Sequence, residues 1–316
     1  MTLKQIQELA VQLGIKNDLR GEAKVKKNME RVKTKYAKMS KEQKEEFDEV
    51  KLTNPYTDSR ILNDTNRKAI KKVMAGIDIE GAELLLAKQL GDIDLVIAHH
   101  PEGRALADLH DVMSLQAEVL SLHGVPINVA ESVIKPRISE VSRGVSPINH
   151  NRNVDIARAL NLDFMCCHTI QDNMAATFIT KLIEKNKSKI DSVGDILQIL
   201  KEVPEYKQSM KHGAGPRLFV GDADNSAGKI VVTEFTGGTN GSKDIYEKMA
   251  QAGIGTIIGM HMGEEHRKEA AKYHINVVIA GHMSSDSLGM NLFLDQLEKR
   301  GIKVVPISGL VRVKRK

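Results

Sequence analysis

The sequence predicts an α/β fold in which mixed or parallel sheets are flanked by helices. Beyond about residue 55, short apolar runs alternate with longer amphipathic stretches, which is the pattern of βα units in a buried sheet. The chain has 316 residues and so exceeds the length of an average domain. We therefore expect two α/β lobes, preceded by a helical arm.

The first part of the chain predicts that arm. Apolar residues recur at helical spacing from Thr2 to about Leu13, and Thr2 and Gln5 are placed to form a capping box. Residues 23–53 are dominated by Lys, Glu and Arg, which is typical of an exposed helix. The dipeptide Asn54-Pro55 breaks this pattern, so we expect the arm to span residues 1–54.

Beyond the arm, the apolar runs mark the expected strands. These runs are residues 73–79, 95–98, 126–130, 164–167, 230–235, 256–260, 277–280 and 304–307. Residues 245–252 and 288–300 are the clearest helical candidates between them. A polar stretch with several glycines and prolines interrupts the alternation near its middle. The expected units are a first lobe over residues 55–185, a connection over 186–225 and a second lobe over 226–316.

Composition narrows the class of protein. The apolar fraction of 41% and charged fraction of 28% are typical of a soluble globular protein. No signal-peptide pattern and no membrane-spanning apolar run are evident, so a cytoplasmic location without membrane contact is expected. Aromatic residues make up only 3%, which argues against a base-stacking surface for nucleic acids. The net charge of +5 lies mostly in the arm and the last residues, so nucleic-acid binding is only weakly supported.

Histidines follow four of the predicted strands, either directly or after one glycine. They are His99 and His100, His168, His261, and His282. In open α/β sheets, ligands bind outside the carboxyl ends of the strands, so these imidazoles are expected around one crevice. A single histidine at a strand end is more often a structural residue. The combination makes a metal site the better interpretation.

Two of these histidines are followed by an aspartate four residues later: His168 by Asp172, and His282 by Asp286. Where a strand leads into a helix, residues at this spacing lie on one side of the first turn and can converge on one cation. Imidazole with carboxylate suits an open site for Zn, Mn or Fe better than a closed structural zinc site, which favours thiolates. The predicted metal ligands are His99, His100, Asp172, His282 and Asp286.

A glycine-rich turn at residues 236–242 follows another predicted strand. Its backbone N–H groups suit an anion, although a tight structural turn explains the same residues equally well. The candidates for binding an anionic small-molecule substrate are Arg104, Gly237, Gly238, Thr239, Gly241 and His261. Glu102 and His168 are the candidate catalytic residues, as groups that transfer a proton.

Together and in this order, the motifs resemble the NIF-three-like family, whose members are also described as type 2 GTP cyclohydrolase homologues or dinuclear-metal-centre hexamers. The resemblance runs from about residue 55 onward. Its signatures are Ala75-Gly-Ile-Asp-Ile-Glu80, Asp94-Leu-Val-Ile-Ala-His-His-Pro101, His168-Thr-Ile-Gln-Asp172, Gly237-Gly238 and Ala280-Gly-His-Met-Ser-Ser-Asp286. It implies a two-lobed α/β subunit, a hexameric ring and two adjacent divalent transition-metal ions.

The resemblance also implies residue roles. His99 and His100 would be ligands from the first lobe, Asp172 a ligand that can bridge the metals, and His282 with Asp286 ligands from the second lobe. The family usually has Glu where this chain has Asp286, so bridging by Asp286 is an open question. The basic arm has no counterpart in typical members.

The expected reaction is hydrolysis of a nucleotide-like or phosphorylated small molecule by a metal-bound hydroxide. The alternative is a non-catalytic metal-binding scaffold or regulatory protein, with nucleic acid as one partner.

Overall fold

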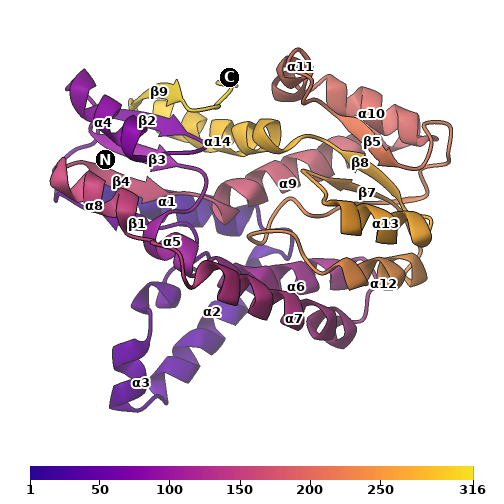
Figure 1. Cartoon of the computed structure of the whole chain (residues 1–316), viewed down its shortest axis with the longest axis horizontal. Coiled ribbons are helices and arrows are strands. Elements are labelled where there is room, and N and C mark those ends of the chain that lie inside the picture. Colours follow the sequence, from indigo (N-terminus) through magenta and orange to yellow (C-terminus); the bar gives the residue numbers. More distant parts are fainter. Residues whose placement is uncertain (316) are drawn as a thin grey trace.

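The computed structural model describes residues 1–315, whose strands form two sheets (Figure 1). The first sheet has the order β1 (Ile61–Asn63), β4 (Asp163–Cys166), β3 (Leu95–Ala98), β2 (Lys72–Gly76) and β9 (Lys303–Ile307). The second has the order β5 (Arg217–Val220), β8 (Asn276–Ile279), β7 (Ile254–Gly259) and β6 (Lys229–Val232). Neighbouring strands are parallel except β1 with β4 and β5 with β8. This arrangement confirms the predicted α/β class with mixed sheets.

Helices cover both faces of the first sheet because its strands are apolar on both sides. Successive strand residues point to opposite faces, so Val73 and Ala75 belong to one core and Met74 to the other. The helices on one face are α1 (Leu3–Lys16), α9 (Thr169–Lys185) and α14 (His282–Glu298). Those on the other face are α4 (Gly81–Leu90), α5 (Gly103–Ala107) and α8 (Arg152–Ala159).

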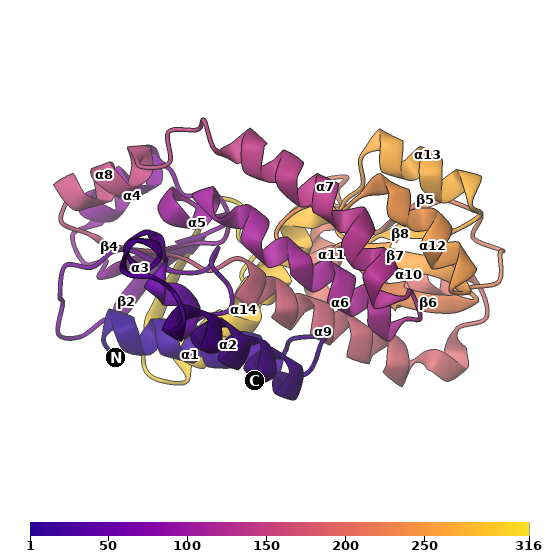
Figure 2. The same cartoon turned by 90° about the horizontal axis from the view of Figure 1, so that it is seen from below.

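The second sheet is covered in the same way. One face packs on α6 (Ser114–Leu122), α7 (Ile127–Val145), α12 (Tyr246–Gln251) and α13 (Glu264–Lys272), with α6 and α7 side by side (Figure 2). The other face packs on α9, α10 (Val193–Lys201) and α11 (Pro204–Met210). Helix α9 contributes Met174 to the core of the first sheet and Ile179 to that of the second. It therefore ties the two sheets together.

Helices α9 and α14 connect the sheets in opposite directions (Figure 1). Helix α9 follows β4 of the first sheet, whereas α14 follows β8 of the second sheet and leads back to β9 in the first. The two helices approach closely at Gly289, where a Cβ atom would lie 2.4 Å from the carbonyl oxygen of Gln171. Because Gln171 lies in the first turn of α9, this contact brings the beginnings of both helices together.

The N-terminal segment consists of a docked helix and a projecting hairpin. Helix α1 has the predicted capping box of Thr2 and Gln5, and it buries Ile6 against the first sheet. Helices α2 (Glu22–Ala37) and α3 (Lys41–Glu46) project from the body, followed by the short 3-10 helix η1 (Glu49–Leu52) (Figure 1). Across residues 1–315, every helix is too short or too polar to cross a bilayer.

One expected strand differs from the structure. The strand predicted at 126–130 is wrong: Pro126 precedes helix α7, which buries Ala130 and Ile134 against the second sheet. The expected connection over 186–225 contains α10, α11 and β5. Strand β9, expected within the second lobe, pairs with β2 in the first sheet. The division into an arm, two lobes and a connection stays a prediction.

Candidate metal centre

The carboxyl ends of three parallel strands lie level at one edge of the first sheet. The register pairs Gly76 of β2 with Ala98 of β3, and Ala98 with Cys166 of β4. His99 directly follows β3, and its backbone N–H donates to the carbonyl oxygen of Gly76 at 2.9 Å. His168 follows β4 after one intervening residue and precedes α9. The strand register therefore places both histidines at the same edge.

The second sheet contributes the beginning of α14. His282 is the first residue of this helix, and its Nε2 atom lies 3.6 Å from Oδ2 of Asp286 one turn later. Gly281 precedes the helix with a φ of 114°, and a Cβ there would lie 2.7 Å from the carbonyl oxygen of Ala214. Only glycine fits this entry to the helix without strain.

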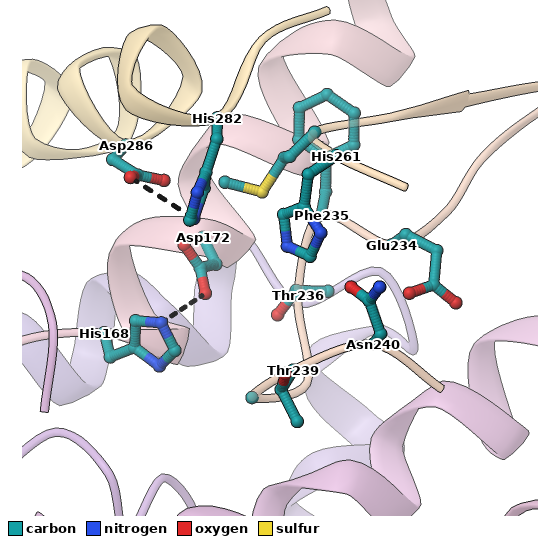
Figure 3. A pocket seen from close by; sticks show the side chains of 12 residues that line it. His168, Asp172, Glu234, Phe235, Thr236, Thr239, Asn240, His261, His282 and Asp286 are labelled. Atoms are coloured by element: carbon teal, nitrogen blue, oxygen red, sulfur yellow. Dashed lines mark ion pairs between the residues drawn. The ribbon is translucent and has the colours of Figure 1, made fainter. Parts of the chain in front are cut away.

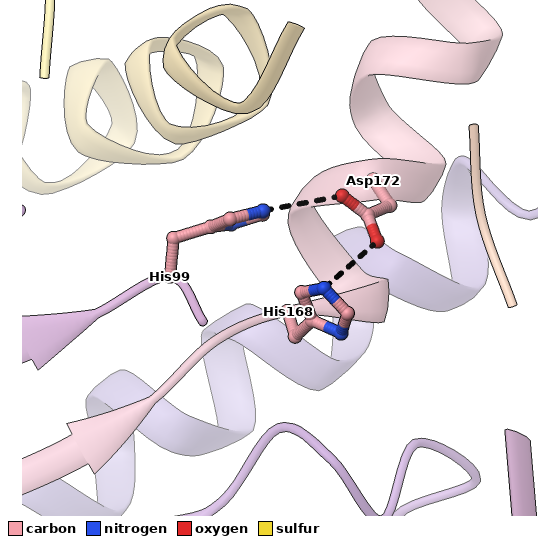
Figure 4. Close-up of side chains that lie close together, drawn as sticks. All are labelled: His99, His168 and Asp172. Carbon is pink, nitrogen blue, oxygen red and sulfur yellow. Dashed lines mark ion pairs between the residues drawn. The ribbon is translucent and has the colours of Figure 1, made fainter. Parts of the chain in front are cut away.

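His99 joins the groups from the two sheets. Its Nε2 atom lies 3.4 Å from Oδ1 of Asp172 and 3.4 Å from Oδ1 of Asp286 (Figure 4 shows the first of these contacts). The Nε2 atom of His168 lies 3.8 Å from the other oxygen of Asp172, and that of His100 lies 3.6 Å from Oδ2 of Asp286. The structure thus brings all the predicted metal ligands, and His168, into one cluster.

Two sets of three side chains in this cluster could hold a metal ion. They are His99 with His168 and Asp172, and His99 with His100 and Asp286. Within residues 1–315, the Nε2 atom of His99, Oδ1 of Asp172 and both carboxylate oxygens of Asp286 are buried without a hydrogen bond. Leaving buried carboxylate oxygens without a donor is unfavourable, and a cation would satisfy them. The donor set therefore fits a divalent transition metal.

The charges of the cluster favour a cation. Burial lowers the pKa of His99, but the neighbouring carboxylates of Asp286 and Asp172 outweigh this effect and raise it to about 9. Burial raises the pKa of Asp172 to about 7. Burial and the adjacent His99 and His168 lower the pKa of His100 to about 4. The two carboxylates thus favour positive charge at the position between them.

Three of the histidines are oriented by a partner on the ring nitrogen that faces away from the cluster. The Nδ1 atoms of His99, His100 and His168 lie 2.9, 2.6 and 2.9 Å from side-chain oxygens of Gln171, Asp78 and Asp58, respectively. A proton on Nδ1 leaves the lone pair of Nε2 directed at the cluster. The sequence analysis missed these partners. Asp78 had a usable signal, because it lies near the end of a predicted strand and within a family signature; Asp58 had none.

The cluster opens into a small pocket between the sheets (Figure 3). It is lined by His168, Asp172, Glu234, Phe235, Thr236, Gly238, Thr239, Asn240, Met260, His261, His282 and Asp286. Its free volume of about 20 Å³ is enough for about one water molecule. The ring centroid of His261 lies 4.6 Å from that of His282. None of these lining residues, all within the described chain, is Lys or Arg, so positive charge must come from imidazoles or bound ions.

The glycine-rich loop forms one wall of this pocket. The Nε2 atom of Gln116 donates to the carbonyl oxygens of Gly237 and Thr239 at 2.9 and 2.6 Å. The backbone N–H of Gly241 donates to Oε2 of Glu234 at 3.2 Å. The loop leads into η4 (Lys243–Ile245) and the six-residue helix α12, so no long helix points its N-terminus at the pocket. These contacts favour a tight structural turn over an anion-binding loop.

The remaining predicted residues lie outside the pocket lining. Arg104 is 57% exposed at its side chain, and its Nε atom donates to Oδ2 of Asp108 at 2.6 Å. Glu102 caps α5, and burial raises the pKa of its carboxyl. Gly237 and Gly241 contribute to the loop but not to the pocket surface. The substrate-binding and proton-transfer roles of these residues stay predictions.

Glu234 is a pocket residue that the sequence analysis missed, and it should make stability depend on pH. Burial raises the pKa of its carboxyl from 4.5 to about 7, so the folded state binds this proton more tightly than the unfolded state. Its contribution to stability therefore falls as pH rises through this range. We therefore compare the free energy of unfolding of Glu234→Gln with that of wild type. We expect this difference to be about 1–2 kcal/mol more favourable to the variant at pH 8 than at pH 5. Urea unfolding at both pH values measures this difference.

The control for this prediction is Glu8→Gln, which changes an exposed carboxyl on α1. We expect this variant to follow the wild type at both pH values. If the stability difference between Glu234→Gln and wild type were the same at pH 5 and pH 8, burial would not perturb the pKa of the Glu234 carboxyl.

Comparison with solved structures identifies relatives of this fold. A NIF3 superfamily protein from Sphaerobacter thermophilus has 32% sequence identity and a TM-score of 0.74, over 80% of this chain and 92% of that chain. Reduced HcgD from Methanocaldococcus jannaschii has 14% identity and a TM-score of 0.45, over 75% and 83%. The hypothetical protein SA1388 of Staphylococcus aureus has 14% identity and a TM-score of 0.40, over 78% and 88%. No protein-family model and no curated protein matches the chain.

Proposed function

The chain belongs to the NIF3 superfamily, and from this premise we propose that it binds two divalent transition-metal ions and uses them to hydrolyse a small molecule. The observation that carries the proposal is the position of His99. Its Nε2 atom lies equally far, at 3.4 Å, from a carboxylate on α9 and a carboxylate on α14, and neither contact is a hydrogen bond. One imidazole and two carboxylates thus face one another with unsatisfied atoms.

His99 would bind only one of the two ions, because its Nε2 atom has a single lone pair, and the other candidate ligands divide between the ions. Asp172 and His168 would hold one ion, whereas His100 and Asp286 would hold the other, with His282 completing the second group from the pocket side. Such ions, when bound, supply positive charge that polarises a substrate and lowers the pKa of water. The shorter side chain of Asp286, compared with the Glu usual in the family, favours Asp172 as the bridging residue.

The chain's own residues set the conditions for the reaction. On the side of the first sheet, histidine Nε2 atoms and carboxylate oxygens face the cluster. The glycine-rich loop closes the pocket on the other side. His261 has its ring beside His282 and makes no hydrogen bond within residues 1–315, so it is available to exchange a proton with a substrate. We propose this role for His261, because Glu102 lies outside the pocket lining.

The proposed substrate is a small anion. Arg104 pairs with Asp108, and burial lowers the pKa of His261 to about 4, so the metal ions would supply the charge that binds it. The free volume of about 20 Å³ means that the enclosed part of the pocket cannot hold a whole nucleotide. This small volume also favours the alternative of a metal-binding protein without catalytic turnover.

Metal analysis of the purified full chain, followed by activity assays, tests the proposal. We expect close to two ions per chain after loading with Zn²⁺ or Mn²⁺, and hydrolysis of p-nitrophenyl phosphate or related esters that a chelator abolishes. Bound metal without hydrolysis of phosphate, carboxylate ester or cyclic amide probes would leave the non-catalytic alternative. No bound metal after loading would refute both.

A hexameric ring, implied by the family resemblance, belongs to the same proposal. Light scattering of the full chain during size-exclusion chromatography would measure its mass. A monomer at micromolar concentration would contradict the hexamer without affecting the metal site.

A further inference from the structure

Asp58 is a fully buried carboxylate beneath the candidate metal centre. Its Oδ2 atom accepts a hydrogen bond from Oγ1 of Thr169 at 2.6 Å and lies 2.9 Å from Nδ1 of His168. Its Oδ1 atom accepts from Oγ of Ser59 at 3.2 Å. These partners are side-chain donors from the start of α9 and from the adjacent Ser59, and no Lys or Arg among residues 1–315 forms an ion pair with Asp58.

The segment that carries Asp58 is a buried turn between the projecting hairpin and β1. The Nδ2 atom of Asn54 donates to the carbonyl oxygen of Ser59 at 2.7 Å, and its Oδ1 accepts from the backbone N–H of Tyr56 at 2.9 Å. The hydroxyl oxygen of Ser59 accepts the backbone N–H of His168 at 2.8 Å. The turn is therefore fixed to both the backbone and the ring of His168.

These contacts determine which ring nitrogen of His168 is protonated. A carboxylate can only accept, so the 2.9 Å contact requires a proton on Nδ1. The lone pair of Nε2 then points toward Asp172, whose Oδ2 atom is 3.8 Å away. His100 has a similar contact with Asp78, but the side chain of Asp78 is 58% exposed, so water can replace it. Water has no equivalent access to Asp58.

We propose that Asp58 is a positioning residue of the metal centre, which holds His168 with Nε2 directed at the cation and thereby makes His168 a metal ligand. This inference rests on the proposed metal binding but not on the hydrolase activity. It changes the role expected for His168, because an Nε2 atom whose lone pair binds a cation is not free to accept a proton. It also makes the segment after the arm part of the functional site.

The variants Asp58→Asn and Asp78→Asn test the proposal as a matched pair, because each replaces one carboxylate partner with an amide of the same shape. We expect Asp58→Asn to weaken Zn²⁺ binding by about 10- to 100-fold in competition with a chromogenic chelator. Asp78→Asn should have a distinctly smaller effect. The visible spectrum of the Co²⁺-loaded protein should change in Asp58→Asn, which reports altered coordination rather than altered stability.

A double-mutant cycle separates positioning from a purely structural role. If Asp58 acts through His168, Asp58→Asn should add nothing to the loss of Zn²⁺ affinity caused by His168→Ala. Additive losses would overturn the proposal, as would wild-type Zn²⁺ affinity and Co²⁺ spectrum in Asp58→Asn.

Nitrogen NMR of the metal-free full chain distinguishes failure of this inference from failure of the proposed function. Histidine nitrogen shifts should show a proton on Nδ1 of His168 in the wild type and a changed pattern in Asp58→Asn. A wild-type protein that binds no Zn²⁺ would refute the proposed function even if this pattern is found. A neutral wild-type His168 ring with its proton on Nε2 and none on Nδ1 would overturn the positioning role by itself.

Discussion

Replacing His99 with alanine is expected to weaken Zn²⁺ binding by at least about 100-fold, the largest loss for any single side chain of the cluster. The reason is geometric: His99 belongs to both groups that could hold a metal ion, whereas Asp172 and Asp286 each belong to one. Its removal also leaves the two buried carboxylates facing each other without the intervening imidazole. Elemental analysis and chelator competition measure the loss.

The matched control for His99→Ala is His261→Ala. His261 lines the same pocket, but it belongs to neither group. We expect His261→Ala to retain near wild-type Zn²⁺ affinity, and circular dichroism should show that both variants are folded. Because the unpaired carboxylates of His99→Ala could prevent folding, the variant Asp286→Asn provides a second test with one less charge. Full metal occupancy in folded His99→Ala and Asp286→Asn would contradict the assignment of the cluster.

Gly289→Ala is expected to destabilise the protein by about 1–3 kcal/mol or more. Alanine normally favours a helix over glycine by about 1 kcal/mol. Here, however, the Cβ would lie 2.4 Å from the carbonyl oxygen and 2.8 Å from the carbonyl carbon of Gln171, which are backbone atoms that cannot rotate away. Helix α14 must shift from α9, and Asp286 must move away from Asp172. Urea unfolding and Zn²⁺ competition should therefore both show a loss.

The control for this prediction is Gly144→Ala in α7. No atom lies within 4 Å of a Cβ built at Gly144, so the intrinsic preference for alanine should give a gain of up to about 1 kcal/mol. Opposite signs for the two substitutions would establish that close helix packing, and not helix propensity, governs Gly289. A gain of stability at Gly289 with unchanged Zn²⁺ affinity would contradict the tight crossing of α9 and α14.

The fold class and the location of the cluster were predictable from local patterns. Parallel strands buried on both faces produce continuous apolar runs, so the runs that became β2, β3, β4, β7 and β8 were visible in the sequence. Because their carboxyl ends meet at sheet edges, the histidines after them could be expected together. The spacing of His168 to Asp172 and of His282 to Asp286 also follows from one helical turn.

Other features depend on contacts between distant segments, which no local pattern reports. Pro126 and its apolar neighbours have the length of a strand, and only packing against the second sheet reveals a helix. Asp58 lies in a loop without regular periodicity, and its role arises from a contact with His168 that spans more than a hundred residues. The sheet that accepts β9 is likewise decided by α14, which returns the chain to β2.

Because the end of the described chain returns to the first sheet, this sheet can be completed only late in the synthesis of the chain. Strand β9 follows every other strand in the sequence, yet it forms one edge of the first sheet beside β2. A nascent chain that has emerged only through β4 and α9 would carry His99, His168 and Asp172 but lack Asp286. Such long-range pairing is slow to form, so the sheet is completed late. The complete ligand set therefore exists only after nearly all of the described chain has left the ribosome.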